Sequence, residues 1–364
     1  MNLLQKIKQS LPVSSRSFHA SHEDMLRIEQ SFNKRIDETI EQLNNQTKEL
    51  EEIKRSLIAH DTHIKMFAWE IYKKENESIE DAKKRFFQAL PKATGNVRLL
   101  QLGCTKLLEE FDVLCKQNNI VYWLDCGTLL GAIRHKGFVP WDDDVDLGIM
   151  RDELNKLIAL ISNSDRYQIT VTYDGYVYCK QVRFSYKNEA IPCFLDLFIY
   201  DWATKDNGDN YENHRKLKKA MIKEMEEAKD LLFWKEIPCY PANADHENVI
   251  QCYFDAYIKK AQDCKIESKD ENECIIWALD NLDDGKPCHL LFNKQDILPT
   301  ETSEFEGLKL PIPRNADLAL KSRYGNYLEL PGDICSHYEH IDRSRFDNEQ
   351  MKETIELLLS NSSI

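Results

Sequence analysis

The chain has 364 residues, of which 48 are Lys or Arg and 62 are Asp or Glu, so its formal charge is −14. This length suffices for two or three structural units, and a hydrophobic content of 42% excludes collagen-like and broadly disordered proteins. The acidic excess argues against a protein that coats nucleic acid, because neutralising phosphates requires clustered Lys and Arg. It leaves open a local pocket for one phosphorylated small molecule.

Residues 1–24 are predicted to form a flexible N-terminal tip. They lack the long apolar segment and cleavage site of a signal peptide, and no stretch of the chain has 18 consecutive apolar residues. Apolar residues between positions 3 and 11 recur at helical spacing beside two lysines. A short amphipathic helix and a peripheral contact with a membrane surface both fit this pattern.

Eleven cysteines are scattered along the chain, an odd number with no Cys-x-x-Cys pair. This usage is typical of reduced thiols and argues against a disulfide framework or a zinc site. We therefore expect a cytoplasmic protein, with peripheral attachment at the inner face of the membrane as the alternative.

Residues 25–90 are predicted to form a long helix or coiled coil, because neither Gly nor Pro occurs between Pro12 and Pro91. Six apolar residues recur there at intervals of seven: Ile36, Leu43, Leu50, Leu57, Ile64 and Ile71. Sustained heptads with charged flanks are typical of a helix that pairs with another helix. We expect a homo-oligomer formed through residues 25–75. Packing of this helix on its own domain is the alternative, because the second seam is apolar only in part.

Residues 96–345 are predicted to form one α/β (α+β) catalytic domain around a mixed sheet. The expected elements, in chain order, are a helix at 99–114, strands at 121–126 and 145–149, a helix at 151–161, a hairpin at 168–186 and a strand at 194–200. These elements mix without a regular βαβ repeat. A charged helical insertion is expected at about 211–290, and residues 346–364 are expected to form a C-terminal helix or tail.

The segment 124–149 carries the strongest chemical signal. A strand ends at Cys126, and Gly127 and Thr128 make a sharp turn into a short helix that stops by Gly137. Thr128 is expected to cap this helix, whose free amides are suited to phosphate oxygens.

Three aspartates downstream of this turn predict a metal site. Asp144 and Asp146 are two residues apart on a strand, so both face one side. Asp196 lies between leucines in the apolar strand at 194–200. Were the two strands neighbours, the three carboxylates would bind Mg²⁺ or Mn²⁺ for phosphoryl or nucleotidyl transfer, and Asp196 could act as general base. An acidic turn without a metal is the alternative.

The run from Gly127 to Asp146 closely resembles the signature of the LicD family, which includes the fukutin-related proteins. Two further segments, 194–198 and 323–331, resemble that family's third-carboxylate strand and its Tyr-Gly motif. The resemblance implies a nucleotidyltransferase-like fold. It also implies transfer of a phosphorylated alcohol, such as phosphocholine or ribitol phosphate, from a CDP-activated donor to a glycan or glycolipid acceptor.

The resemblance also implies roles for individual residues. Asp144, Asp146 and Asp196 would bind the metal, and Asp142 would be a further ligand or would position the loop. Gly127 and Thr128 would cradle the donor phosphates. The Gly-Gly or Gly-Ser pair of many nucleotidyltransferases is replaced here by Gly127-Thr128 after Cys126.

Four other residues are candidates for substrate contact. Arg134 is suited to phosphate, because a guanidinium binds phosphate with two parallel hydrogen bonds. Trp141 could stack on a base or sugar, or could anchor the core. Arg323 and Tyr324 are expected to line the donor or acceptor pocket, on the resemblance alone.

Two readings of other kinds remain open. In the first, the Asp144-Val-Asp146 sequence is the DxD motif of a glycosyltransferase that uses a nucleotide sugar. No nucleotide-binding β-α-β half is evident in the sequence before the motif, which argues against a glycosyltransferase. In the second, the chain is a coiled-coil scaffold with a degenerate transferase domain, which the intact carboxylates disfavour. The choice among choline, ethanolamine, ribitol and glycerol stays open.

Overall fold

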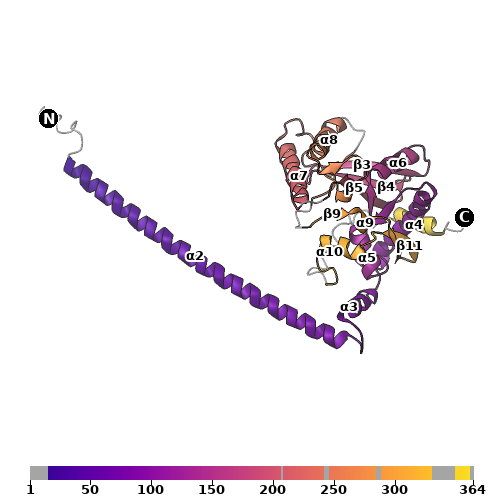
Figure 1. The fold of residues 1–364 in the computed structure, drawn as a ribbon, viewed down its shortest axis with the longest axis horizontal. Helices are drawn as coiled ribbons and strands as arrows, with labels where there is room; N and C mark the ends of the chain where they lie inside the picture. The colour runs from indigo at the N-terminus through magenta and orange to yellow at the C-terminus, as the bar shows by residue number, and fades with distance from the viewer. Residues whose placement is uncertain (1–14, 206–207, 242–245, 284–287, 330–348, 361–364) are drawn as a thin grey trace. The chain divides into compact units, whose positions relative to one another are not determined.

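A computed structural model of the chain describes residues 15–205, 208–241, 246–283, 288–329 and 349–360 (Figure 1). The chain divides into two compact units, Met1–Ile79 and Glu80–Ile364. The amphipathic pattern predicted between positions 3 and 11 lies outside the described residues. None of the described helices is both long enough and apolar enough to cross a membrane.

The first unit consists of one helix of 58 residues, α2 (Ser15–Tyr72). The predicted long helix is therefore confirmed up to Tyr72, but its extension to residue 90 is wrong. The chain leaves the helix and passes through Asn76, whose φ is 63°, before α3 (Ile79–Gln88) begins. Asn tolerates this left-handed conformation better than most residues, so the helix ends without Gly or Pro.

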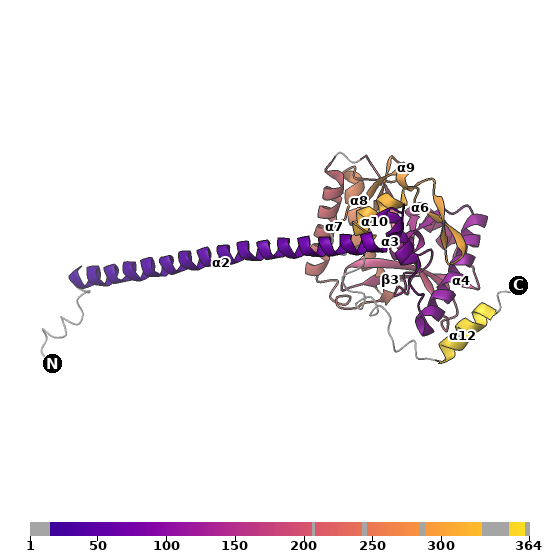
Figure 2. The ribbon, with the colours of Figure 1, turned by 90° about the horizontal axis from the view of Figure 1, so that it is seen from below.

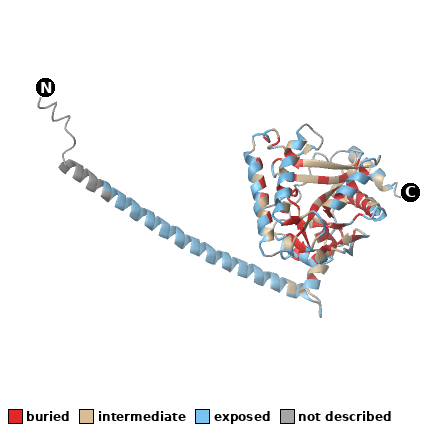
Figure 3. Ribbon diagram, turned by 45° about the horizontal axis from the view of Figure 1, so that its top comes forward, coloured by how far each residue is buried: buried red, intermediate tan, exposed pale blue. Residues whose placement is uncertain are grey.

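The apolar heptad residues of α2 are exposed to solvent (Figure 3). From Ile36 to Ile71, each of the six is between 43% and 69% exposed. Within the first unit, no other described segment covers this stripe.

The second unit is built on a mixed nine-stranded sheet with the order β1-β2-β5-β4-β3-β6, which β7, β8 and β9 extend beside β5. The strands are β1 (Tyr122–Leu124), β2 (Asp146–Met150), β3 (Tyr167–Asp174), β4 (Cys179–Tyr186), β5 (Phe194–Ala203), β6 (Tyr240–Pro241), β7 (Glu267–Ser268), β8 (Cys274–Trp277) and β9 (Leu291–Asn293). Strands β2 and β5 are parallel, and every other pair is antiparallel. The predicted mixed sheet is confirmed, and so is the hairpin, as β3 and β4.

Helices pack on this sheet and bury its apolar side chains. Besides two helices described below, the further elements of the unit are α4 (Gly95–Gln117), α5 (Cys126–Arg134), α6 (Arg151–Ile161), α9 (Lys294–Ile297), β10 (Glu301–Phe305), β11 (Leu308–Ile312), α10 (Ala316–Tyr324) and α12 (Glu349–Ser360). The first of these runs beside α12, whose Ile355 joins the core (Figure 2). On β5, Leu195, Leu197 and Ile199 are buried, while Asp196 and Phe198 alternate with them on the more open face.

The predicted helical insertion is correct only in its first part. Helices α7 (Asn210–Glu227) and α8 (Glu247–Asp263) lie side by side and enclose a second apolar core. Beyond Asp263 the prediction is wrong, because β7 and β8 pair with β5. A four-residue apolar run such as Cys274–Trp277 does not distinguish a strand from a helix by its periodicity. The added strands pair with the C-terminal part of β5, from Tyr200 to Ala203.

A buried ionic cluster joins α6, β5 and the loop after β8. Arg151 donates to both oxygens of Asp201 at 2.6 Å and to those of Asp280 at 2.8 and 3.1 Å. These contacts lower the pKa of Asp280 to about 2, although its burial opposes that shift. Removal of the guanidinium would leave two buried carboxylates without their main counter-charge.

We expect Arg151→Leu to reduce the free energy of unfolding by about 3–5 kcal/mol, because breaking a buried ion pair leaves uncompensated charge. Urea denaturation at pH 7 measures this change. The matched control is Arg166→Leu, which removes the arginine of the more exposed Arg166–Glu110 ion pair (2.6 Å) and should cost about 0–1 kcal/mol. Equal losses in the two variants would contradict the role given to the cluster.

Candidate active site

The pairing of two parallel strands brings the predicted carboxylates together. Asp146 on β2 lies directly opposite Asp196 on β5, and the backbone N–H of Asp196 donates to Val145 O at 2.8 Å. Val145 and Leu147 are buried, as expected for the residues that alternate with Asp144 and Asp146. The two strands are therefore neighbours, which was the condition for a three-carboxylate site.

The acidic side chains form two overlapping groups. One oxygen each of Asp144, Asp146 and Asp196 lie within 4.8 Å of one another, and Asp142, Asp143 and Asp144 form a second such group. Carboxylate oxygens are the ligands that hard divalent cations prefer. The first group, with a buried member flanked by two half-buried ones, has the donor chemistry of a metal site. Asp142 lies at its edge.

The charges within this cluster are poorly compensated by the chain itself. Burial, followed by the charges of Asp144, Asp142 and Asp196, raises the pKa of Asp146 well above its ordinary value. Burial and the charge of Asp144 likewise raise the pKa of Asp142. A divalent cation among these oxygens would remove the repulsion, so the residues fit such an ion.

Arg183 is the cation that the chain supplies to the cluster. It lies opposite Asp196 on β4, donates from Nε to Asp196 Oδ1 at 2.8 Å, and packs over the ring of Phe194. Burial raises the pKa of Asp196 to about 6, and Arg183 limits that rise. The sequence analysis missed Arg183. The pattern that could have indicated Arg183 was a charged residue within a strand in which apolar and polar residues alternate.

The turn after β1 holds Asp146 in place. The N–H of Gly127 donates to Asp146 Oδ2 at 3.0 Å, and the N–H of Asp146 donates to Thr128 Oγ1 at 2.8 Å. A Cβ on Gly127 would lie 2.7 Å from Asp142 Oδ2, so a larger residue there would force the Asp142 carboxylate to move. Thr128 is 1% exposed, and its hydroxyl is directed at β2.

The predicted cap of the helix after this turn is wrong. Helix α5 begins at Cys126, and Asp125 is its N-cap, with a side chain that accepts from the N–H of Cys126 at 2.8 Å. The other oxygen of Asp125 accepts from the hydroxyl of Tyr200 at 2.7 Å. Thr128 thus lies within the first turn of the helix, where its hydroxyl supports Asp146 instead.

Gln101 holds the acidic loop from the other side. This α4 residue is 1% exposed, and its Nε2 donates to Asp142 O at 2.7 Å. Its role was not predicted. A lone amide within the apolar stripe of a helix was the available signal, because a buried amide needs a hydrogen-bond partner.

Arg134 and Trp141 lie in different surroundings from each other. Arg134 is buried over the ring of Phe87, and its Nη1 donates to the backbone carbonyl of Tyr327 at 2.9 Å, while its contact with phosphate stays a prediction. Burial lowers the pKa of Arg134 to about 10. Trp141, next to the acidic loop, lines an open groove that Lys92 and Thr94 also line.

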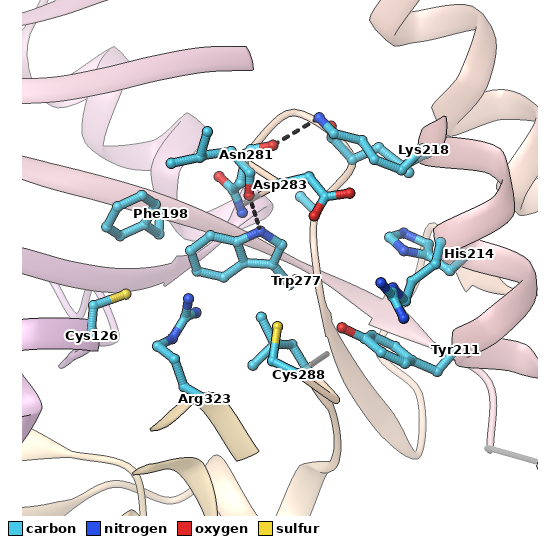
Figure 4. A pocket seen from close by; sticks show the side chains of 15 residues that line it. Cys126, Phe198, Tyr211, His214, Lys218, Trp277, Asn281, Asp283, Cys288 and Arg323 are labelled. Carbon is cyan, nitrogen blue, oxygen red and sulfur yellow. Dashed lines mark hydrogen bonds between the residues drawn. The ribbon is translucent and has the colours of Figure 1, made fainter. Parts of the chain in front are cut away.

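Arg323 and Tyr324 end helix α10 close to the turn. The guanidinium of Arg323 lies 4.2 Å from the ring centroid of Trp277 (Figure 4). Tyr324 is 39% exposed as a residue, and burial of its hydroxyl, followed by the charges of Cys126 and Asp146, raises its pKa. Both residues are thus brought to the carboxylate cluster from far away in the sequence.

Comparison with known proteins places this geometry in a family. Residues 119–240 match the family model described as LicD/FKTN/FKRP, nucleotidyltransferase domain. The chain carries a LicD-family nucleotidyltransferase domain. The matched stretch contains Asp142, Asp144, Asp146 and Asp196, whereas Arg323 lies beyond it.

Individual relatives cover different shares of the chain. The lipopolysaccharide cholinephosphotransferase LicD of Haemophilus influenzae is 26% identical over 270 residues, which is 68% of this chain and 97% of that protein. An uncharacterised protein of Rickettsia prowazekii is 40% identical over 81 residues, 22% of this chain and 30% of its own. Mouse ribitol 5-phosphate transferase FKRP is 58% identical over 33 residues, 9% of this chain and 7% of its own.

We expect Asp146→Asn to raise the melting temperature in EDTA at pH 7.5, because the amide still accepts from Gly127 while one buried negative charge is removed. The expected shift is about 2–4 °C per kcal/mol of repulsion relieved. Mg²⁺ should raise the melting temperature of the wild type and not that of the variant. Scanning fluorimetry measures both effects.

The control for this experiment is Asp165→Asn, an exposed aspartate outside the cluster. It should leave both the EDTA value and the Mg²⁺ response unchanged. In the wild type without metal, folded Asp196 binds its proton more tightly than unfolded Asp196, because its pKa is raised from 3.8 to about 6. The free energy of unfolding therefore decreases as the pH rises from about 3.8 to about 6. A variant that melted below the wild type in EDTA, with an intact Mg²⁺ response, would contradict the site.

Proposed function

We propose that this chain is a divalent-cation-dependent phosphotransferase that moves a phosphorylated alcohol from a CDP-activated donor to a sugar hydroxyl of a glycan or glycolipid. The observation that carries this proposal is the convergence of Asp144, Asp146 and Asp196 in a LicD-family domain. The names of two relatives, a cholinephosphotransferase and a ribitol 5-phosphate transferase, describe transfer of this class of group. The CDP donor follows from the family resemblance.

Asp144, Asp146 and Asp196 are assigned to hold the cation, with Asp142 as a further ligand or as the residue that positions the loop. Mg²⁺ and Mn²⁺ both suit a donor set made only of carboxylate oxygens. When bound, the cation neutralises the charge on the donor phosphate oxygens.

The residues around the cation have distinct tasks in this proposal. Asp196 is also assigned to accept the proton of the attacking hydroxyl as general base. Arg183 orients it by binding one of its oxygens. Gly127 and Thr128 are assigned to the donor phosphates through the backbone at the start of α5. Trp141 is assigned to the acceptor side, in its open groove.

A glycosyltransferase that uses a nucleotide sugar is the alternative for the same Asp144-Val-Asp146 sequence. It shares the need for a cation, so metal dependence does not separate the two. The transferred group separates them, because a glycosyltransferase would move the sugar and leave a nucleoside diphosphate. The matched nucleotidyltransferase family model favours the phosphotransferase.

A cytoplasmic location is part of the proposal, with peripheral attachment at the inner face of the membrane as a variant of it. The ten cysteines within the described residues are all free thiols. That observation suits a reducing compartment.

We expect purified protein with Mg²⁺ to release CMP from one member of a panel of CDP-choline, CDP-ethanolamine, CDP-ribitol and CDP-glycerol. Mass spectrometry should find the phospho-alcohol on the sugar acceptor. Asp146→Ala should lower this turnover by about 10²–10³-fold or more, because charge stabilisation at the reacting phosphate is lost. Circular dichroism should show the variant to be folded.

The exposed Asp165→Asn serves again as the control and should turn over like the wild type. Unchanged turnover in a folded Asp146→Ala protein would refute the site assignment. Sugar transfer from a nucleotide sugar, without CMP release from any CDP-alcohol, would replace this function with the glycosyltransferase.

We also propose that α2 pairs with α2 of a second copy of the chain. Its heptad stripe from Ile36 to Ile71 is exposed, and apolar stripes of this length are typical of helices that associate. The polar Thr39, Gln46 and His60 interrupt the second seam. Polar core positions in coiled coils limit stability while they set register.

We expect the double substitution Leu50→Asp, Leu57→Asp in the full chain to lower the oligomeric state, because it buries four charges per helix pair. Sedimentation equilibrium measures the mass. Thr62→Asp, outside both seams, is the control and should keep the mass of the wild type. A double variant with the wild-type mass would rule out association through this stripe.

A further inference from the structure

A cavity of about 180 Å³ lies beside strands β5 and β8 (Figure 4). A single buried water needs only roughly 10–15 Å³ by the same kind of measure, so the space admits a much larger ligand. The side chains that line it come from β5, β8, α7 and α10 and include Phe198, Trp277, Tyr211, Arg215 and Arg323. The sequence did not predict that Phe198, Trp277 or Tyr211 would be a site residue.

Strand β5 and the turn before α5 connect the cavity with the carboxylates. Asp196 and Phe198 are two residues apart, so their side chains stand on the same face of the sheet, about 6.6 Å apart along the strand. Cys126, which also lines the cavity, directly precedes Gly127, whose N–H binds Asp146. A ligand that fills the cavity is therefore directed towards the cluster.

Aromatic rings and a guanidinium form the inner part of the cavity. Phe198 and Trp277 stack with ring centroids 4.9 Å apart and planes inclined by 30°, and Arg323 lies over Trp277. Nη2 of Arg323 is buried and has no hydrogen-bond partner within the described residues. A buried donor of a charged group is costly when unpaired, so this nitrogen is poised for an acceptor atom of a ligand.

The wall opposite the rings is held rigidly by hydrogen bonds. Lys218 Nζ donates to Leu279 O at 2.6 Å and to Asn281 O at 2.8 Å. The side-chain amide of Asn281 donates to Ile199 O at 2.7 Å and accepts from Ile199 N at 3.1 Å. The loop after β8 is thus fixed to β5 next to Phe198, and the cavity is preformed.

The charges of the lining residues select the kind of occupant. Three cationic side chains, Arg215, Lys218 and Arg323, line the cavity against one carboxylate, Asp283. A positively charged alcohol such as choline would be repelled, although aromatic rings alone would attract it. A ligand that joins a planar ring to an anionic group satisfies both the rings and the cations.

We propose that this cavity binds the nucleoside half of the donor. Its base lies among Phe198, Trp277 and Tyr211, and Arg323 donates to the phosphate next to the ribose. The diphosphate then extends towards Asp146 and Asp196. This inference rests on the proposed function for the identity of the base, but the binding of a nucleotide is testable without any turnover.

Isothermal titration of the full chain with CMP in EDTA tests the proposal. We expect CMP to bind, and Phe198→Leu and Arg323→Gln each to weaken it roughly 10-fold or more, since base stacking and a charged contact are lost. Phosphocholine and pyrophosphate, which lack the base, should bind at least 10-fold more weakly than CMP. Leu282→Trp adds a bulky ring to an exposed lining residue and should also block CMP.

Two matched controls lie outside the cavity. Phe233→Leu, in the core beside α7 and α8, and Arg166→Gln, in a surface ion pair, should bind CMP like the wild type. Equal CMP affinity in wild type, Phe198→Leu and Leu282→Trp would overturn the proposal, and so would pyrophosphate that binds as tightly as CMP.

Measurements of turnover distinguish a failure of this inference from a failure of the proposed function. If both hold, Phe198→Leu raises KM for the CDP-alcohol with little change in kcat, because the base contact is made equally in the ground and transition states. Turnover with unchanged KM in that variant overturns the inference alone. CMP binding that the variants weaken, without turnover of any CDP-alcohol, overturns the proposed function alone.

Discussion

Electrostatic repulsion between carboxylates on adjacent strands is the constraint on which the candidate site depends. Parallel pairing of β2 with β5 sets Asp146 opposite Asp196, and the acidic loop brings Asp142 and Asp144 to the same place. Burial and mutual repulsion raise the pKa of Asp146. A fold that assembles such a cluster is less stable for it unless a cation binds, and the neighbouring parts of the structure are arranged accordingly.

Those parts hold the acidic side chains without neutralising them. Gly127 and Thr128 bind Asp146 through a backbone N–H and a hydroxyl, and Gln101 binds the backbone of Asp142. Among the described residues, Arg183 brings a full positive charge into contact with Asp196. Uncharged supports fix positions while leaving the negative charge available to a metal ion, which is the arrangement that metal-assisted phosphoryl transfer requires.

The same sheet separates two regions of different chemistry on one face. Asp196 belongs to the hard, oxygen-rich cluster, and Phe198, two residues further along β5, belongs to a cavity of rings and cations. Strand β8, which pairs with β5, and helix α7 both line that cavity. Helix α7 lies within the matched residues 119–240, whereas β8 lies beyond them.

The features that have a local signal in the sequence could be predicted from the sequence alone. The spacing of Asp144 and Asp146, the apolar neighbours of Asp196 and the Gly127-Thr128 turn predicted the cluster, because strand alternation sets which side chains share a face. The hairpin and helix α6 followed from periodicity in the same way. The heptads predicted α2, but its end at Tyr72 depended on Asn76, which adopts a left-handed conformation without Gly or Pro.

Only the tertiary structure decided the contacts between residues far apart in sequence. Arg183 reaches Asp196 through strand pairing, Arg134 binds the carbonyl of Tyr327, and Arg323 meets Trp277 across the cavity. The strand at Cys274–Trp277 was predicted as helix, because its short apolar run acquires a conformation only by pairing with β5. The sequence therefore predicted which carboxylates lie together, and the fold decided what surrounds them, because burial and strand order depend on the whole chain.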